Sequence, residues 1–149
     1  MATDDDTGSP PPAYRLHYLL KRAHLQLAEL VGQALEPYGI DPRELAALTL
    51  LTGDDALSQQ DLARQLQVDR TTMVALVDRL EGLDLVRRRP DPDDRRKNVV
   101  ELTEHGRRTG ADATRAMDVV ERDFLAAAPE LVPAAFRDTL WSLSRDFRH

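Results

Sequence analysis

At 149 residues, with 42% hydrophobic side chains, the chain is long enough to bury a core as a single domain. It contains no cysteine, which excludes disulfides, thiolate metal sites and a thiol redox switch. No apolar run approaches the roughly 20 residues that span a bilayer, and the N-terminus lacks the basic and apolar regions of a secretory signal. A cytoplasmic location is therefore expected.

The formal net charge is −6, and its distribution is more informative than its sum. Residues 57–102 carry nine Lys/Arg and nine Asp/Glu, so the whole excess of negative charge lies outside this segment. Residues 85–98 contain six basic and three acidic side chains. An acidic body with a basic tip would allow only the tip to approach a polyanion.

The chain begins with a predicted disordered tail at residues 1–12, which are acidic and then rich in proline. Residues 13–149 are predicted to form one domain. Apolar residues recur at helical spacing from Ala13 to about Leu35, and this segment is too long and too apolar for a helix that lies purely on the surface. The Pro-Tyr-Gly run at residues 37–39 ends the helix.

Three shorter helices are predicted next. Asp41 caps the first of them, which stops near Gly53. Ser58 opens the second with a capping-box-like pattern. Asp69 caps the third, and Gly82 is predicted to close it at the C′ position.

A hairpin and two more helices complete the predicted order. Residues 85–89 and 98–102 have strand composition, and the prolines between them indicate a loop because proline cannot donate to a ladder. Thr103 caps a long helix that continues to Ala128, and Pro133 starts a last helix. The predicted fold class is therefore mainly α, with a small β-hairpin.

The second and third of the shorter helices are separated only by Gln67 and Val68, the short connection of a helix-turn-helix. In that motif the second helix enters the major groove of DNA with its N-terminal residues against base edges. The order of these two helices, with a basic hairpin directly after them, indicates a DNA-binding unit.

The outer face of the helix that Asp69 caps carries mostly short side chains, which a helix needs in order to lie deep in a groove. Thr71, Thr72 and Arg79 are predicted to lie on it, opposite the apolar side chains. Threonine can form hydrogen bonds or contact thymine methyls, and Arg79 can reach guanine or phosphate. Arg70, beside the cap, is assigned to a phosphate. An ordinary surface helix is the alternative, and the spacing alone does not decide between them.

The hairpin would act as a wing whose tip lies over the adjacent minor groove or backbone. Arg95 and Arg96 lie near the tip. A narrow minor groove has an enhanced negative potential, which favours the binding of an arginine side chain. Asp94 can hold the guanidinium of Arg96 in one pose by a bidentate contact. The predicted phosphate partners beside the tip are Arg87, Arg88, Arg89 and Lys97. A solvated hairpin with internal ion pairs is the alternative.

The run VDRTTMVALVDRLEGLDLVRRRPDPDDRRKNVVELTEHG, residues 68–106, resembles the MarR family of winged helix-turn-helix transcriptional regulators. The family's wing has the form Asp-x-Arg, five intervening residues, then Leu-Thr. The residues that meet this pattern are Asp94, Arg96, Leu102 and Thr103. The match is specific over about residues 57–106, and the flanking helices agree in order and length.

The resemblance implies a homodimer that binds a pseudo-palindromic operator. Residues 41–102 would form the winged helix-turn-helix, and residues 13–36 and 104–149 would supply the dimerisation helices. Arg96 would occupy the minor groove with Asp94 orienting it. The working end of the recognition helix would be formed by Arg70, Thr71 and Thr72.

Apolar stripes over residues 16–34 and 136–147 exceed what a winged domain needs. They could pack within one subunit or across a two-fold axis, and periodicity does not separate these possibilities. Function favours the dimer, because two half-sites about 34 Å apart require two recognition helices at a fixed separation.

Proteins similar to this one often release DNA when a small anionic, frequently aromatic, ligand enters between the dimer region and the wing domain. Candidate polar groups lie near the start of the first long helix, at Arg15, His17 and Tyr18. Arg15 could pair with a carboxylate through two hydrogen bonds. Ordinary exposed side chains are the alternative at each position.

The leading hypothesis is a ligand-responsive, DNA-binding repressor without cofactor or metal. Its partners would be an operator duplex, a second copy of the chain and a small aromatic acid or similar effector. The alternative is a helical protein-interaction module that uses the basic wing without specific DNA binding. An enzyme is not expected, because the sequence has no Gly-rich phosphate loop, nucleophile elbow or metalloprotease motif.

Arg96→Ala should weaken binding to a duplex selected from a random pool by about tenfold, because a contact of about 1–3 kcal/mol is lost. Fluorescence anisotropy measures the affinity. Sedimentation should show an unchanged oligomeric state, which separates a lost DNA contact from a lost dimer. Equal affinity of the variant and the natural chain would exclude the wing assignment.

Overall fold

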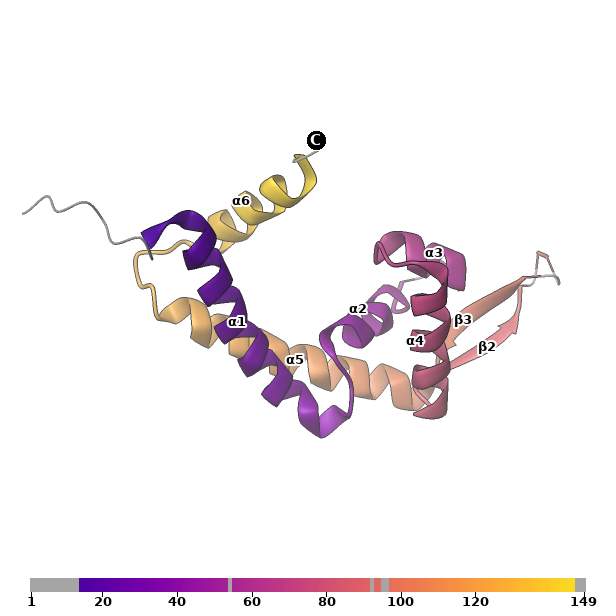
Figure 1. Ribbon diagram of the computed structural model, residues 1–149. Coiled ribbons are helices and arrows are strands. Elements are labelled where there is room, and N and C mark those ends of the chain that lie inside the picture. Colours follow the sequence, from indigo (N-terminus) through magenta and orange to yellow (C-terminus); the bar gives the residue numbers. More distant parts are fainter. Residues whose placement is uncertain (1–13, 54, 92, 95–96, 147–149) are drawn as a thin grey trace, which may run out of the picture.

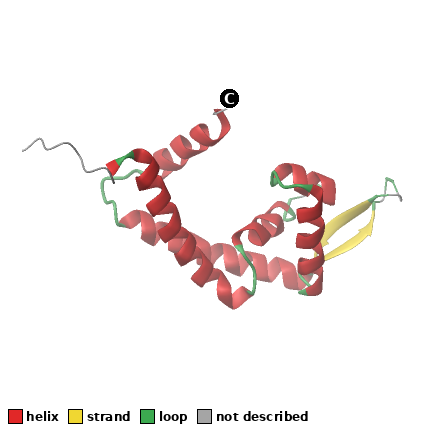
Figure 2. Ribbon diagram, in the orientation of Figure 1, coloured by secondary structure: helices red, strands yellow, loops and turns green. Residues whose placement is uncertain are grey.

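The computed structural model describes residues 14–53, 55–91, 93–94 and 97–146. In chain order, its elements are α1 (Leu16–Leu35), the 3-10 helix η2 (Glu36–Tyr38), α2 (Pro42–Leu50), β1 (Leu57–Ser58), α3 (Gln59–Gln65), α4 (Arg70–Gly82), β2 (Val86–Pro90), β3 (Asn98–Leu102), α5 (Glu104–Ala126) and α6 (Pro133–Asp146). Figure 2 shows how strongly helix dominates, so the predicted fold class is confirmed. The predicted tail, residues 1–12, lies outside the described residues.

The elements form two parts (Figure 1). We call α1, α5 and α6 the arm; within it α1 packs along α5, and α6 follows at the far end. We call residues 42–102 the lobe, in which α2, α3, α4 and the sheet lie together at the other end of α5. One apolar core continues through both parts, from Val31 and Leu35 on α1 to Leu80 on α4 and Val100 on β3.

All four predicted side-chain caps are confirmed. The side chains of Asp41, Ser58, Asp69 and Thr103 each accept a hydrogen bond from the backbone N–H three residues further on. The first two are complete capping boxes, in which the third helical residue also accepts from the backbone of the cap. Each cap contributes about 1 kcal/mol by satisfying a donor that the helix leaves unpaired.

Helix α4 does not end as predicted, because Gly82 is its last residue and not the left-handed residue after it. Asp84 takes the left-handed conformation instead, with φ of 56°. The N–H of Leu85 donates to the carbonyl of Leu80 at 2.9 Å, which closes the helix as a Schellman motif. A short polar side chain tolerates this conformation better than most. Helix α2 is also shorter than predicted and ends at Leu50.

The sheet has a third strand that the sequence did not predict. Its order is β1-β3-β2, and both pairings are antiparallel. Leu57 of β1 lies opposite Val100, and β2 pairs with β3 from Val86 opposite Leu102 to Pro90 opposite Asn98. A strand of two residues is too short to show an alternating pattern, so only its partner defines it.

Arm and lobe meet where α5 begins. The hydroxyl of Thr103 donates to the carbonyl of Asp84 at 2.6 Å, and its N–H donates to the carbonyl of Leu85 at 3.1 Å. Gly106 packs directly against this turn, and a Cβ added to it would lie 1.8 Å from the Leu85 carbonyl oxygen. Only glycine allows the two backbones to approach this closely.

Gly106→Ala should therefore destabilise the fold by about 1–3 kcal/mol, because the added methyl group must push two backbone segments apart. Urea unfolding monitored by circular dichroism gives the free energy. Gly110→Ala is the matched control on the same helix, since its Cβ would lie 3.5 Å from the Leu48 Cβ, an ordinary contact. The control should be stabilised by up to about 1 kcal/mol through helix propensity. Equal stability of the two variants would contradict the close approach.

Candidate nucleic-acid interface

The buried side of α4 is the one that the sequence predicted. Its buried residues are Met73, Leu76, Val77 and Leu80. Their packing against the lobe core turns the N-terminal end of the opposite face outward, where Arg70 and Thr71 are exposed. The buried side and the exposed N-terminal end of α4 are therefore as the spacing predicted, and the contacts of Arg70 and Thr71 with DNA stay a prediction.

The first turn of α4 is held by its cap. Asp69 accepts hydrogen bonds from the N–H of Thr72 at 2.9 Å and from its hydroxyl at 2.5 Å. These two bonds lower the pKa of the Asp69 carboxyl below its usual value. Because the Thr72 hydroxyl donates its proton to the cap, Thr72 can offer only its oxygen and methyl group to DNA, whereas Thr71 is exposed.

Arg79 has partners within the chain. Its Nε donates to Oε1 of Glu44 at 2.5 Å, and its terminal nitrogen donates to the carbonyl of Gly39 at 2.8 Å. The guanidinium therefore lies toward α2 and the segment that links arm to lobe. A contact of Arg79 with DNA stays a prediction, and the intrachain partners give this residue another role.

The arginines of β2 differ in how firmly they are held. Arg88 is half-buried and pairs with Asp78 and Glu81 of α4, while its Nε donates to the side-chain oxygen of Gln59 at 3.0 Å. Burial lowers the pKa of Arg88, but the bonds to Asp78 and Glu81 raise it by more, so the pKa lies above its usual value. Arg88 therefore joins the wing to α3 and α4.

The two neighbours of Arg88 point to the other side of the sheet and share one carboxylate. Arg89 pairs with Glu101 on β3, and the Arg87 Nε lies 3.4 Å from the same side chain. The hydrogen bond from Arg89 lowers the pKa of Glu101. Internal ion pairs of this kind were the alternative to a DNA-binding wing. Arg87 is exposed, and such a surface pair is worth only about 0–1 kcal/mol, so Arg87 can exchange Glu101 for a phosphate at little cost. Arg89 and Glu101 are both half-buried and form the firmer of the two pairs.

The base of the wing tip is closed by Asp91, a residue that the sequence analysis did not single out. Its N–H donates to the carbonyl of Lys97 at 2.9 Å, and its carboxylate accepts from the N–H of Asp93 at 2.8 Å. Asp94 is half-buried in this turn and its carbonyl accepts from the N–H of Lys97. Arg95 and Arg96 lie outside the described residues, so the predicted contact between Asp94 and Arg96 stays a prediction.

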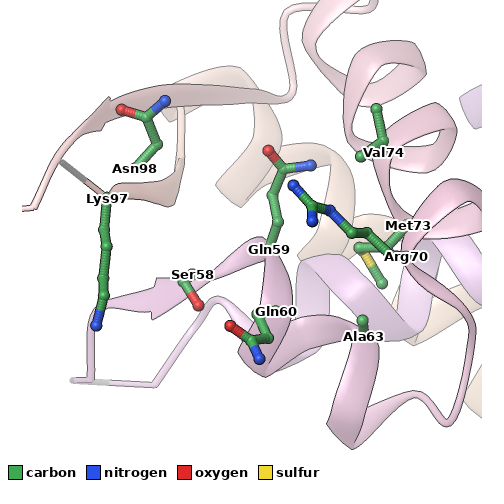
Figure 3. A pocket seen from close by; sticks show the side chains of 9 residues that line it. All are labelled: Ser58, Gln59, Gln60, Ala63, Arg70, Met73, Val74, Lys97 and Asn98. Atoms are coloured by element: carbon green, nitrogen blue, oxygen red, sulfur yellow. The ribbon is translucent and has the colours of Figure 1, made fainter.

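A groove of about 430 Å³ lies between the start of α3, the start of α4 and the base of the wing (Figure 3). Its lining residues are Ser58, Gln59, Gln60, Ala63, Arg70, Met73, Val74, Lys97 and Asn98. Figure 3 shows the guanidinium of Arg70 and the side-chain amide of Gln59 extending into this space. The Gln59 amide nitrogen is buried and has no hydrogen-bond partner among the residues that the structure describes. Hydrogen-bond donors from α3, α4 and the base of the wing therefore line one groove.

The predicted ligand residues lie apart from this surface. Arg15, His17 and Tyr18 are exposed at the start of α1, where the rings of His17 and Tyr18 meet edge-on at 5.5 Å between centroids. A second crevice, of about 540 Å³, opens between α2, the end of α3 and α5. Its lining residues are Pro42, Leu45, Ala46, Thr49, Leu50, Gln65, Leu66, Thr114, Met117, Asp118 and Glu121. The crevice thus lies between arm and lobe, and its lining does not include Arg15, His17 or Tyr18, whose role in ligand binding stays a prediction.

The arm exposes many large apolar side chains. On α1 and just before it these are Tyr14, Leu16, Tyr18, Leu19, Leu20, Leu25 and Leu30, and on α6 they are Leu140, Trp141 and Leu143. Trp141 is 63% exposed and Leu16 is 68% exposed. Large exposed apolar patches are rare on monomeric proteins and mark interaction sites. Among the described helices, none combines the length and apolar content needed to span a bilayer.

Comparison with known proteins decides the family. A family model described as MarR family matches residues 38–97, which run from the end of η2 through the lobe to the wing tip. One relative is the HTH-type transcriptional repressor NicR of Pseudomonas putida, which is 37% identical over 90 residues. That match covers 60% of this chain and 56% of the relative, so the chain spans just over half the length of the curated relatives it matches.

Solved structures extend the similarity to the arm. The transcriptional repressor CouR bound to a 23-mer DNA duplex is 34% identical, with a TM-score of 0.73, over 87% of this chain and 89% of that one. The chain belongs to the MarR family. CouR from Rhodococcus jostii RHA1 bound to p-coumaroyl-CoA is 31% identical, with a TM-score of 0.77, over 92% of this chain and 96% of that one. The MarR resemblance seen in the wing residues is thus confirmed, and the kinship is with transcriptional regulators and not with enzymes.

Proposed function

We propose that this MarR-family protein is a homodimeric repressor, acting in the cytoplasm, that binds a pseudo-palindromic operator and is released by a small anionic, possibly aromatic, ligand. The observation that carries the DNA-binding part is the groove that both Arg70 of α4 and Lys97 of the wing line, from opposite sides. The exposed Thr71 stands at the N-terminal end of α4, where recognition helices contact base edges. The similar repressor CouR has been solved on a DNA duplex, which supports this use of the fold.

A second copy of the chain is the proposed cover for the apolar side chains of the arm. Helix α6 has no buried residue among those described, although Leu140, Trp141 and Leu143 lie along it. Burying them together with the exposed leucines of α1 would bring the two chain ends together across a two-fold axis. A symmetric dimer of this kind would hold two lobes at the fixed separation that a two-fold operator requires.

Salt dependence tests the proposal against its alternative, a protein-interaction module with a basic wing. Log affinity for a selected duplex should fall steeply and linearly with log salt concentration, because each phosphate contact releases counterions. Arg70→Ala should reduce the slope by about one per subunit and weaken binding similarly for all sequences. Arg115→Ala on α5 is the control, since Arg115 is an exposed arginine paired with Asp112 in the arm. Weak binding without salt dependence for every duplex would refute the proposal.

The effector part of the proposal has separate support. The CouR repressor was solved with p-coumaroyl-CoA, an aromatic acyl thioester with an anionic carrier, so a similar fold takes up such a ligand. In this chain the crevice between α2 and α5 is apolar enough to receive an aromatic ring, but its charged lining residues are Asp118 and Glu121. The anionic group of a ligand would therefore have to lie away from these carboxylates, and Arg15, which precedes α1 and lies outside the crevice lining, is the proposed partner.

Arg15→Ala should abolish release of DNA by an aromatic acid while leaving affinity for the operator unchanged, because it removes the proposed partner of the carboxylate. A screen of aromatic acids and their thioesters, read by anisotropy of labelled operator, supplies the ligand. Ala46→Trp, which fills the crevice, should also remove the response if the ring binds there. If Arg15→Ala still responds to the ligand, Arg15 does not belong to the ligand site. If Ala46→Trp still responds, the ring does not bind in the crevice.

A further inference from the structure

One carboxylate of the lobe is buried. Glu44, in the first turn of α2, is 3% exposed, and it is the buried charged residue among those described. Its Oε2 accepts from the N–H of Asp41 at 2.8 Å, which completes the capping box. Its Oε1 accepts from the Nε of Arg79 at 2.5 Å. A buried carboxylate requires such partners, because burial removes its hydration.

Arg79 connects more than one partner. Its terminal nitrogen donates to the carbonyl of Gly39, the residue that ends η2 with a left-handed φ of 65°. Gly39 belongs to the segment at residues 36–41, where the chain first passes from arm to lobe. One guanidinium therefore joins the recognition helix, the first helix of the lobe and the first crossing between the two parts.

The chain crosses between arm and lobe a second time, from β3 into α5. At this point Thr103 is bonded to the carbonyls of Asp84 and Leu85, in the turn that ends α4. Helix α4 is thus attached to both crossings, at its C-terminal turn through Thr103 and one turn earlier through Arg79. Its direction relative to the arm depends on these two attachments.

We propose that Glu44 and Arg79 are a positioning pair, which fixes the direction of α4 relative to the arm and thereby sets the half-site separation that the dimer accepts. The inference rests on the proposed homodimer and its two-fold operator. Because its guanidinium is engaged by Glu44 and Gly39, Arg79 in this proposal acts through α4, which replaces the DNA contact predicted for Arg79 from the sequence. Release of the pair would leave each lobe able to bind a half-site while loosening the geometry between the two lobes.

The pair must be removed without leaving a buried charge. Arg79→Met alone would leave Glu44 unpaired and would destabilise the lobe, whatever the role of the pair. The double variant Glu44→Gln/Arg79→Met removes both charges, and the glutamine oxygen can still accept from Asp41. Arg79→Lys is the conservative variant, which retains the charge opposite Glu44 but lacks the second arm that reaches Gly39. Circular dichroism and thermal unfolding establish that each variant is folded.

The experiment measures affinity for duplexes that carry two selected half-sites about one helical turn apart, and for duplexes with base pairs inserted or removed between them. A duplex with one half-site is measured in parallel. The natural chain should discriminate sharply among spacings. The double variant should lose this preference by roughly fivefold or more while binding the single half-site unchanged, and Arg79→Lys should be intermediate. Arg115→Met is the matched control and should behave like the natural chain.

Two outcomes would overturn the proposal. Lower affinity of the double variant for the single half-site would show that Arg79 contacts DNA. An unchanged spacing preference in a folded double variant would show that the pair only stabilises the lobe. Failure of the natural chain to bind any duplex would instead refute the proposed function itself, together with this inference, and is recognised before any variant is compared.

Discussion

The close approach of α5 to the end of α4 is the constraint on which the rest of the structure depends. Gly106 permits it, because any side chain there would collide with the carbonyl of Leu85. Thr103 secures it by capping α5 while bonding to the carbonyls of Asp84 and Leu85. Helix α4 and the long helix of the arm therefore share a boundary.

The arm and the lobe, which meet at this boundary, expose surfaces of different character. The core that runs through both parts leaves the arm with an exposed apolar face and the lobe with an exposed polar one. In the proposed response to an effector, a ligand in the crevice between α2 and α5 would contact both parts. It would need to bind one arrangement more tightly than the other, because only differential affinity shifts a conformational equilibrium.

The electrostatics of the lobe sort its arginines into two groups. Arg88 and Arg79 are held by carboxylates on other elements: Arg88 fastens the wing to α4, and Arg79 fastens α4 to α2. Arg70 and Arg87 are exposed, so binding of a phosphate there costs little. A net charge of −6 is therefore compatible with a DNA-binding surface, because the positive charge that can be exchanged is concentrated there.

The sequence by itself determined the local features. Caps at Asp41, Ser58, Asp69 and Thr103, the buried side of α4 and the MarR-type wing pattern all depend on residues within a few positions of each other, so spacing reveals them. Only the tertiary structure decided the rest. The strand β1 exists because β3 lies beside it, and the role of Arg79 depends on Glu44, which is 35 residues away. Helical periodicity states which side a residue occupies, but not which distant element will meet it there.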